Sequence, residues 1–226
     1  MKAKRAVPSH SGARQPATVA KACLPFILAS ASPRRRTLLE QYGYIFTISA
    51  AAVSEIAPPY LTPGETVLYN ARAKARFVAE HSPAALVLGV DTVVVFEDEI
   101  FGKPENLPAA EAMLRRLNGR SHEVYSGVWL AHLAGGRERG FIEITRVHFQ
   151  RRSAAQLRTY LARIGPLDKA GAYAAQDDRG EMIEAAEGSF TNVVGLPMER
   201  LERELRAYWG GQLERTANAA TFSKTG

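Results

Sequence analysis

The sequence predicts an α/β protein that folds as one compact unit. Residues 26–29 form an apolar run that leads at once into a helix start at Pro33, so a strand, a tight turn and a helix follow one another. Residues 86–96 form the most apolar run of the chain and predict a central buried strand. Capping boxes at Thr62 and Ser153 open two further helices, and such alternation of strands and helices is typical of α/β folds.

The positive charge is concentrated at the start of the chain. The formal net charge is +6, and residues 1–22 hold five Lys or Arg residues and no Asp or Glu. This segment predicts a disordered basic extension, although an acid-free leader also resembles a transit peptide. Residues 23–209 then form the folded domain, and residues 210–226 are expected to be a flexible tail. Because the folded part is nearly neutral, its charge does not predict nucleic-acid binding.

Composition also excludes several classes of protein. The sequence contains no run of eighteen apolar residues, so no membrane partner is expected. Cys23 is the sole cysteine, which excludes an internal disulfide and a cysteine-rich metal site. These features predict a cytoplasmic protein.

The turn after residues 26–29 carries the first candidate site. Ser32 is predicted to cap the helix that begins at Pro33, and Arg34, Arg35 and Arg36 occupy its first turn. Three cations there oppose the helix dipole, so a bound anion, best a phosphate, would explain them. A solvated basic patch is the alternative for this segment taken alone.

The next elements add a carboxylate and a lysine. A second strand is predicted over residues 44–48, and Glu55 follows it as either a site residue or a solvated loop carboxylate. The helix predicted from residue 63 to about residue 80 places Asn70 and Lys74 on the same face as Val67. Lys74 therefore points inward or, as most surface lysines do, reaches into solvent.

Asp91 interrupts the most apolar strand. A carboxylate in such surroundings must be paired, bound to metal or held with a raised proton affinity for chemistry. The alternative is a turn at Asp91 and Thr92 between two short strands.

Most of the second half of the chain is predicted to be structural. A hairpin tip is predicted at residues 98–99, and strands are predicted over residues 124–133 and 141–149. Helices are predicted over residues 108–117 and 198–209, and a further helix begins at the capping box of Ser153. Two loops differ from this pattern. Lys103 stands in a tight Gly-Lys-Pro loop, and residues 169–176 are rich in small residues that suit a planar ligand. Gln176 can donate and accept at once, as reading a base edge requires, although a plain glycine-containing loop stays open.

Six motifs together resemble the Maf family of nucleoside triphosphate pyrophosphatases, from about residue 24 to residue 205: LASASPRR at 28–35, NARAKA at 70–75, GVDTVV at 89–94, GKP at 102–104, KAGAY at 169–173 and NVVGLP at 192–197. The resemblance implies the fold of the inosine triphosphate pyrophosphatases, an α/β protein with a mixed, elongated sheet, flanking helices and a central cleft. It also implies a homodimer.

The implied reaction is hydrolysis of a nucleoside triphosphate to the monophosphate and pyrophosphate with the help of a divalent cation, Mg²⁺ or Mn²⁺. By the resemblance Asp91 is the general base, and Glu55 helps Asp91 to hold the metal. The remaining matched residues bind the phosphates and are Ser30, Arg34, Arg35, Lys74 and Lys103.

The same resemblance addresses substrate choice. Arg34, Thr92 and Gln176 match positions associated with it, and the glutamine indicates the dTTP/UTP branch rather than the 7-methyl-GTP branch. Two departures from the family pattern are Ala174-Ala175, where a glycine and a bulkier aliphatic residue are usual, and Ser126-Gly127, where threonine-glycine is usual. Neither is expected to touch the chemistry.

A non-catalytic nucleotide- or nucleic-acid-binding regulator is the rival interpretation, since the family is also linked with arrest of septum formation. The basic extension favours it. A carboxylate inside the most apolar strand has no use in an inert binder, so the enzyme is preferred, with a nucleoside triphosphate and no specific nucleic acid as its partner.

Overall fold

The computed structural model describes residues 23–178 and 180–216. Its strands are β1 (Phe26–Leu28), β2 (Thr47–Ile48), β3 (Leu86–Phe96), β4 (Glu99–Phe101), β5 (Ser121–His132), β6 (Arg137–Phe149) and β7 (Ile183–Glu187). Its α-helices are α1 (Pro33–Gln41), α2 (Pro63–His81), α3 (Leu107–Leu117), α4 (Ala154–Ile164), α5 (Phe190–Val194) and α6 (Met198–Trp209). Three short 3₁₀ turns, η1 (Pro166–Asp168), η2 (Ala170–Ala172) and η3 (Ala175–Asp177), follow α4.

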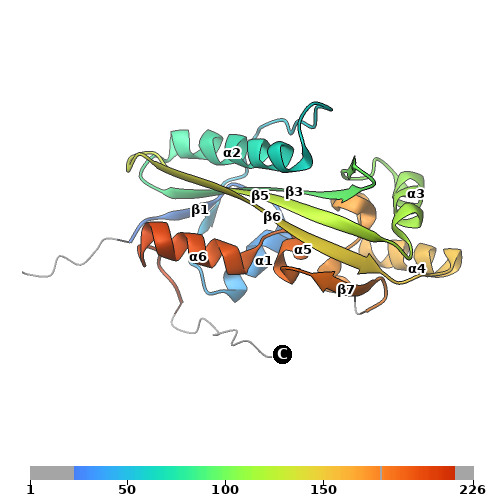
Figure 1. Ribbon diagram of the computed structural model, residues 1–226. Helices are drawn as coiled ribbons and strands as arrows, with labels where there is room; N and C mark the ends of the chain where they lie inside the picture. Colours follow the sequence, from blue (N-terminus) through green and yellow to red (C-terminus); the bar gives the residue numbers. More distant parts are fainter. Residues whose placement is uncertain (1–22, 179, 217–226) are drawn as a thin grey trace, which may run out of the picture.

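The strands form one mixed, elongated sheet in the order β2-β1-β3-β5-β6-β7, with β4 paired to the end of β3. Strand β1 runs parallel to β2 and β3, and the other neighbours are antiparallel. Helix α2 lies on one face, α1, α5 and α6 lie on the other, and α3 and α4 pack at the far end (Figure 1). The predicted mixed α/β architecture is confirmed.

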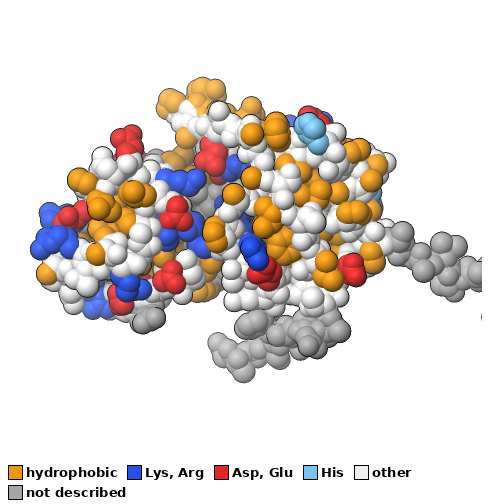
Figure 2. Space-filling model, turned by 180° about the vertical axis from the view of Figure 1, so that it is seen from behind, with side chains coloured by type: hydrophobic (Ala, Val, Ile, Leu, Met, Phe, Trp, Pro, Cys, Tyr) orange, Lys and Arg blue, Asp and Glu red, His pale blue; other side chains and the backbone are white. Residues whose placement is uncertain are grey.

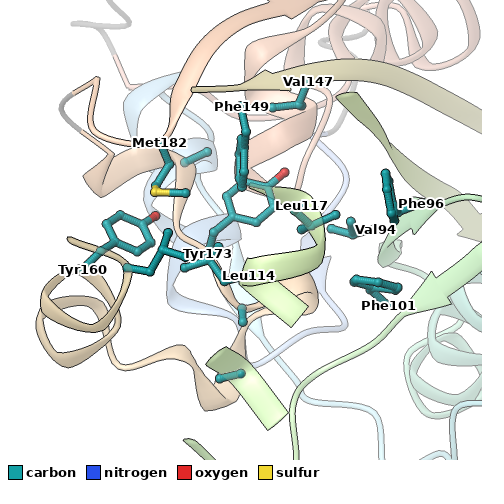
Figure 3. Close-up of a cluster of buried hydrophobic side chains, with 14 of the residues drawn as sticks. Val94, Phe96, Phe101, Leu114, Leu117, Val147, Phe149, Tyr160, Tyr173 and Met182 are labelled. Carbon is teal, nitrogen blue, oxygen red and sulfur yellow. The ribbon is translucent and has the colours of Figure 1, made fainter. Parts of the chain in front are cut away.

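Two large apolar clusters stabilise the two ends of this sheet. One joins β1, α1 and α6 to the first half of β3, including Leu88 and Val90. The other joins α3 and α4 to the second half of β3, including Val94 and Phe96 (Figure 3). Strand β3 therefore passes from one cluster to the other, and Asp91 and Thr92 lie at the crossing.

Helix α2 lies unusually close to the sheet because two glycines face it. A Cβ atom added to Gly89 would lie 2.1 Å from the backbone oxygen of Ala71, and one added to Gly127 would lie 2.3 Å from the backbone of Val67. Gly127 is also the register partner of Asp91. The side chains that α2 directs at the sheet thus arrive next to Asp91.

Several predicted elements match the structure closely. Strand β3 spans the predicted residues 86–96, α6 spans the predicted 198–209, and α2 begins with the predicted capping box at Thr62. Because β3 continues through Asp91 with pairing on β5, the alternative of a turn at Asp91 and Thr92 is wrong.

Other predictions need correction. The predicted strand over 44–48 is reduced to Thr47–Ile48, because Tyr44 instead packs its ring against Phe26 and bridges to Arg215. The hairpin tip lies at Glu97 and Asp98, one residue earlier than predicted, since both adopt a positive φ. Strand β7 and helix α5 were not predicted.

The predicted extension, residues 1–22, lies outside the described residues, as do residues 217–226 of the predicted tail. The described residues of that tail include Leu213, which pairs with Leu24, and Arg215, which pairs with Tyr44. Within the described ranges, no helix has both the length and the apolar character needed to cross a membrane.

His122 of β5 makes the free energy of unfolding depend on pH. Its ring lies edge-on to Phe149 and Tyr173, and burial, helped by the charge of His148, lowers the pKa of His122 to about 3. The unfolded chain therefore binds a proton below about pH 6.5 that the folded chain does not. We expect this residue to remove about 2 kcal/mol of folding free energy between pH 7 and pH 5.

Urea unfolding of the wild type and His122→Gln at both pH values measures this contribution. The lost Tyr173 contact affects the variant equally at pH 7 and pH 5, so it cancels in the comparison. If the free energy of unfolding changed equally between pH 7 and pH 5 in the two proteins, the pH dependence would not come from His122.

Candidate active site

A cavity of about 610 Å³ lies where the two clusters meet. It is lined by the β1–α1 turn, the middle of β3, the loop after β4, the turns η1 to η3 and residues 193–195. Lys and Arg side chains gather in a hollow of the surface, with carboxylates beside them (Figure 2). All nine predicted site residues line the cavity, namely Ser30, Arg34, Arg35, Glu55, Lys74, Asp91, Thr92, Lys103 and Gln176.

Lys74 is the centre of the charged cluster. Its ammonium donates to Oδ1 of Asp91 and Oε1 of Glu55, both at 2.7 Å. Lys74 and Asp91 are only 8% and 5% exposed. Lys74 thus points inward, and Asp91 satisfies the requirement that a buried charge be paired.

Glu55 completes the cluster from a segment without regular structure. Burial raises the pKa of its carboxyl, but the hydrogen bond and charge of Lys74, with the charges of Lys103 and Arg35, outweigh this and lower the pKa overall. Glu55 is therefore ionised at neutral pH.

Asn70 holds the Glu55 segment in place. Its amide accepts from the backbone N–H of Ile56 at 3.0 Å and donates to the carbonyl of the same residue at 2.9 Å. The same Nδ2 atom donates to Oδ2 of Asp91 at 3.0 Å. Asn70 was not among the predicted site residues, although its spacing of four from Lys74 on α2 was the signal for it.

Arg35 ties three parts of the chain together. Nε donates to the carbonyl of Gly195 at 2.9 Å, Nη1 to the Ser30 hydroxyl at 2.9 Å, and Nη2 to the Thr92 hydroxyl at 3.1 Å. Burial lowers the pKa of Arg35 to about 10, with Asp91 opposing the shift, so the guanidinium remains charged at neutral pH. It presents a fixed positive charge to the cavity.

Arg34 lines the cavity and is partly buried. It bonds to Asp168 of η1 at 3.1 Å, and the other oxygen of Asp168 accepts from Lys169 at 2.5 Å. Burial raises the pKa of Asp168, but Lys169 and then Arg34 more than offset this, so the pKa is lowered.

The helix start itself differs from the prediction in two ways. Arg36 is exposed and pairs with Glu40 on its own helix, so only two of the three arginines reach the cavity. The Ser32 side chain makes no capping bond, and the backbone N–H of Ser32 donates to the Ser30 hydroxyl.

Part of the cavity lining is apolar and suits a planar group. This apolar wall includes Val94, Val124, Tyr173 and Val193. Gln176 is exposed and also lines the cavity, and its amide donates to Asp177 at 3.0 Å.

The donor set fits a divalent cation that arrives with a phosphate ligand. Asp91 and Glu55 lie close together, since an oxygen of each is 2.7 Å from the same Lys74 ammonium. Among the described residues no group of three or more His, Cys, Asp or Glu side chains could hold a metal alone. Mg²⁺ is commonly bound by one or two carboxylates together with substrate phosphates and water, so two carboxylates are sufficient.

Fold and site together define an α/β protein with a central cleft. Its cleft is lined by cations, by apolar side chains that suit a planar group, and by a buried carboxylate paired with a lysine. The family model described as Maf-like protein matches residues 25–208, and the chain belongs to this family, as the motifs predicted. A dTTP/UTP pyrophosphatase of Salinibacter ruber is 46% identical over 191 residues, which cover 84% of this chain and 94% of that protein. Proteins of the same name from Pelotomaculum thermopropionicum and Exiguobacterium sibiricum are 44% and 46% identical, over 80% and 81% of this chain and 95% and 92% of their own.

Removing Lys74 tests the charge balance of the cluster. Lys74→Met leaves the buried Asp91 without the cation hydrogen-bonded to it, and we expect it to cost about 3–5 kcal/mol of folding free energy. The double variant Lys74→Met with Asp91→Asn removes both charges, so it should be more stable than Lys74→Met alone.

Urea unfolding at neutral pH measures these differences. Arg36→Met, which breaks an exposed pair, is the control and should cost at most about 0.5 kcal/mol. A loss no larger for Lys74→Met than for this control would show that the buried pair does not stabilise the fold.

Proposed function

We propose that this protein is a nucleoside triphosphate pyrophosphatase that hydrolyses dTTP and UTP to the monophosphate and pyrophosphate. The observation that carries the proposal is the Asp91–Lys74–Glu55 cluster, a buried carboxylate compensated by an ammonium at the floor of a cationic cavity. The names of the relatives above agree with it. An inert binder would not need that carboxylate, so the regulator of septum formation is the weaker alternative.

The phosphates are bound by cations that approach the cavity from different elements. Arg34 and Arg35 come from α1, Lys74 from α2 and Lys103 from the loop after β4. Such preorganised charges stabilise the charge that develops during phosphoryl transfer. In this proposal the Ser30 hydroxyl, which Arg35 holds, also faces the phosphate chain.

Asp91 accepts the proton of the attacking water. Its carboxylate lines the cavity while Lys74 and Asn70 fix both oxygens, so its position is set before substrate binds. Glu55 and Asp91 would hold Mg²⁺ or Mn²⁺ beside the phosphates, and the cation would supply charge neutralisation.

Base choice is assigned to Gln176 and its surroundings. A primary amide can pair with the adjacent acceptor and donor of a thymine or uracil edge. The apolar wall of Val94, Val124 and Val193 would contact the base, while Thr92 and Arg34 contribute to substrate choice. The assembly as a homodimer and the cytoplasmic location complete the proposal.

A panel of nucleoside triphosphates tests both the activity and the base choice. We expect wild-type kcat/KM for pyrophosphate release to be about ten- to a hundredfold higher with dTTP and UTP than with ATP, GTP, CTP and 7-methyl-GTP, because a mismatched base leaves polar groups unpaired. Gln176→Ala should lose about tenfold with dTTP and UTP and little with the others.

Gln212→Ala, outside the cavity lining, is the control for this panel. A preference of the wild type for a purine triphosphate, or an equal loss with every substrate, would refute the role of Gln176. If none of the triphosphates released pyrophosphate, the proposed activity would be refuted.

Asp91→Asn tests the general base separately. The amide is nearly isosteric but cannot take the proton of water, so kcat should fall by roughly a hundredfold or more. Asp98→Asn, at the exposed hairpin tip, should keep wild-type kcat, and urea unfolding checks that both variants fold. A near-normal kcat for Asp91→Asn would remove Asp91 from this role.

A further inference from the structure

Ser126 lies directly behind a cavity residue. It is the register partner of Thr92 on the neighbouring strand β5, and its hydroxyl lies 2.8 Å from the Thr92 hydroxyl. Ser126 is 0% exposed, so no ligand in the cavity touches it, whereas Thr92 is only partly buried and lines the cavity. Any effect of Ser126 on a ligand must therefore pass through Thr92.

The direction of each proton in this pair follows from the partners. Among the described residues, Thr92 Oγ1 is the only hydrogen-bond partner of the Ser126 hydroxyl. If Thr92 donated to Ser126, the buried Ser126 proton would have no acceptor, at a cost of about 1–3 kcal/mol. Ser126 therefore donates to Thr92.

Thr92 Oγ1 also accepts a second hydrogen bond. The Nη2 group of Arg35 lies 3.1 Å away, and a guanidinium can only donate. A hydroxyl oxygen has two lone pairs, and Ser126 and Arg35 occupy both. Thr92 thus cannot accept a bond from a ligand, and its own proton is available to donate.

That proton has a poor partner in the protein. The carbonyl of Gly195 lies 3.4 Å from Thr92 Oγ1 and already accepts from Nε of Arg35 at 2.9 Å. A ligand oxygen in the cavity at an ordinary hydrogen-bond distance would be the better acceptor.

We propose that Ser126 is a positioning residue that, together with Arg35, makes the Thr92 hydroxyl an obligate hydrogen-bond donor to an acceptor oxygen of the bound nucleotide. The acceptor is either a phosphate oxygen or a carbonyl oxygen of the pyrimidine. This inference rests on the proposed function for the identity of the ligand. It also bears on the departure at Ser126-Gly127, because the Ser126 hydroxyl contacts Thr92, which lines the cavity.

A double-mutant cycle tests the coupling between the two hydroxyls. Ser126→Ala, Thr92→Val and the double variant are compared with the wild type for binding of α,β-imido-dUTP by titration calorimetry and for kcat/KM with UTP. We expect Ser126→Ala to weaken binding about five- to tenfold when Thr92 is present and less than twofold in the Thr92→Val background. Ser121→Ala, which removes a hydroxyl from the exposed start of β5, is the matched control and should leave binding unchanged.

The outcomes separate this inference from the proposed function. Equal, additive losses in the cycle, or unchanged binding by Ser126→Ala, would overturn the inference even if UTP is hydrolysed. Binding of the analogue without hydrolysis of UTP would refute the activity, and the binding cycle would still decide the role of Ser126. A wild type that neither binds the analogue nor hydrolyses UTP would overturn both.

Binding of inorganic tripolyphosphate by the same four proteins identifies the acceptor. Coupling of the same size with this probe assigns the Thr92 proton to a phosphate oxygen. Coupling seen with α,β-imido-dUTP alone assigns it to the base carbonyl. Either result supports the donor role of Thr92.

Discussion

The site depends on the close approach of helix α2 to strands β3 and β5. Gly89 and Gly127 permit this approach, since any Cβ atom at either position would overlap the backbone of the helix. The approach brings Lys74 and Asn70 within hydrogen-bond distance of Asp91 on β3. Without it, Asp91 would be a buried, unpaired charge in the most apolar strand, which neither folding nor catalysis could use.

The cavity combines fixed and exchangeable contacts. Arg35 is fixed by three hydrogen bonds, to the turn after β1, to the middle of β3 and to Gly195 after α5, so the position of its charge in the cavity is fixed. Arg34 is held by the exposed carboxylate of Asp168, and Gln176 by Asp177. In the proposed function a nucleotide would replace these two exposed contacts, while the contacts of Arg35 would stay in place.

Sequence reasoning identified residues that line the cavity where one segment contains the whole signal. The buried strand with Asp91, the inward face of α2 and the arginines after β1 each follow from local periodicity and capping. What it missed depends on contacts between distant segments. Asn70 binds Ile56 and Ser126 binds Thr92 only once the sheet and the 49–60 segment are in place. Ser32 is a helix cap by residue type, but its side chain makes no capping bond in the structure.

The most direct test of the proposed active site is a crystal structure of the full chain with α,β-imido-dUTP and Mg²⁺. The account predicts that the triphosphate lies among Arg34, Arg35 and Lys103, with the α,β-bridge beside Asp91 and the uracil edge against Gln176. A nucleotide bound outside this cavity, or one turned so that its base lies at Asp91 and its phosphates at Gln176, would contradict it.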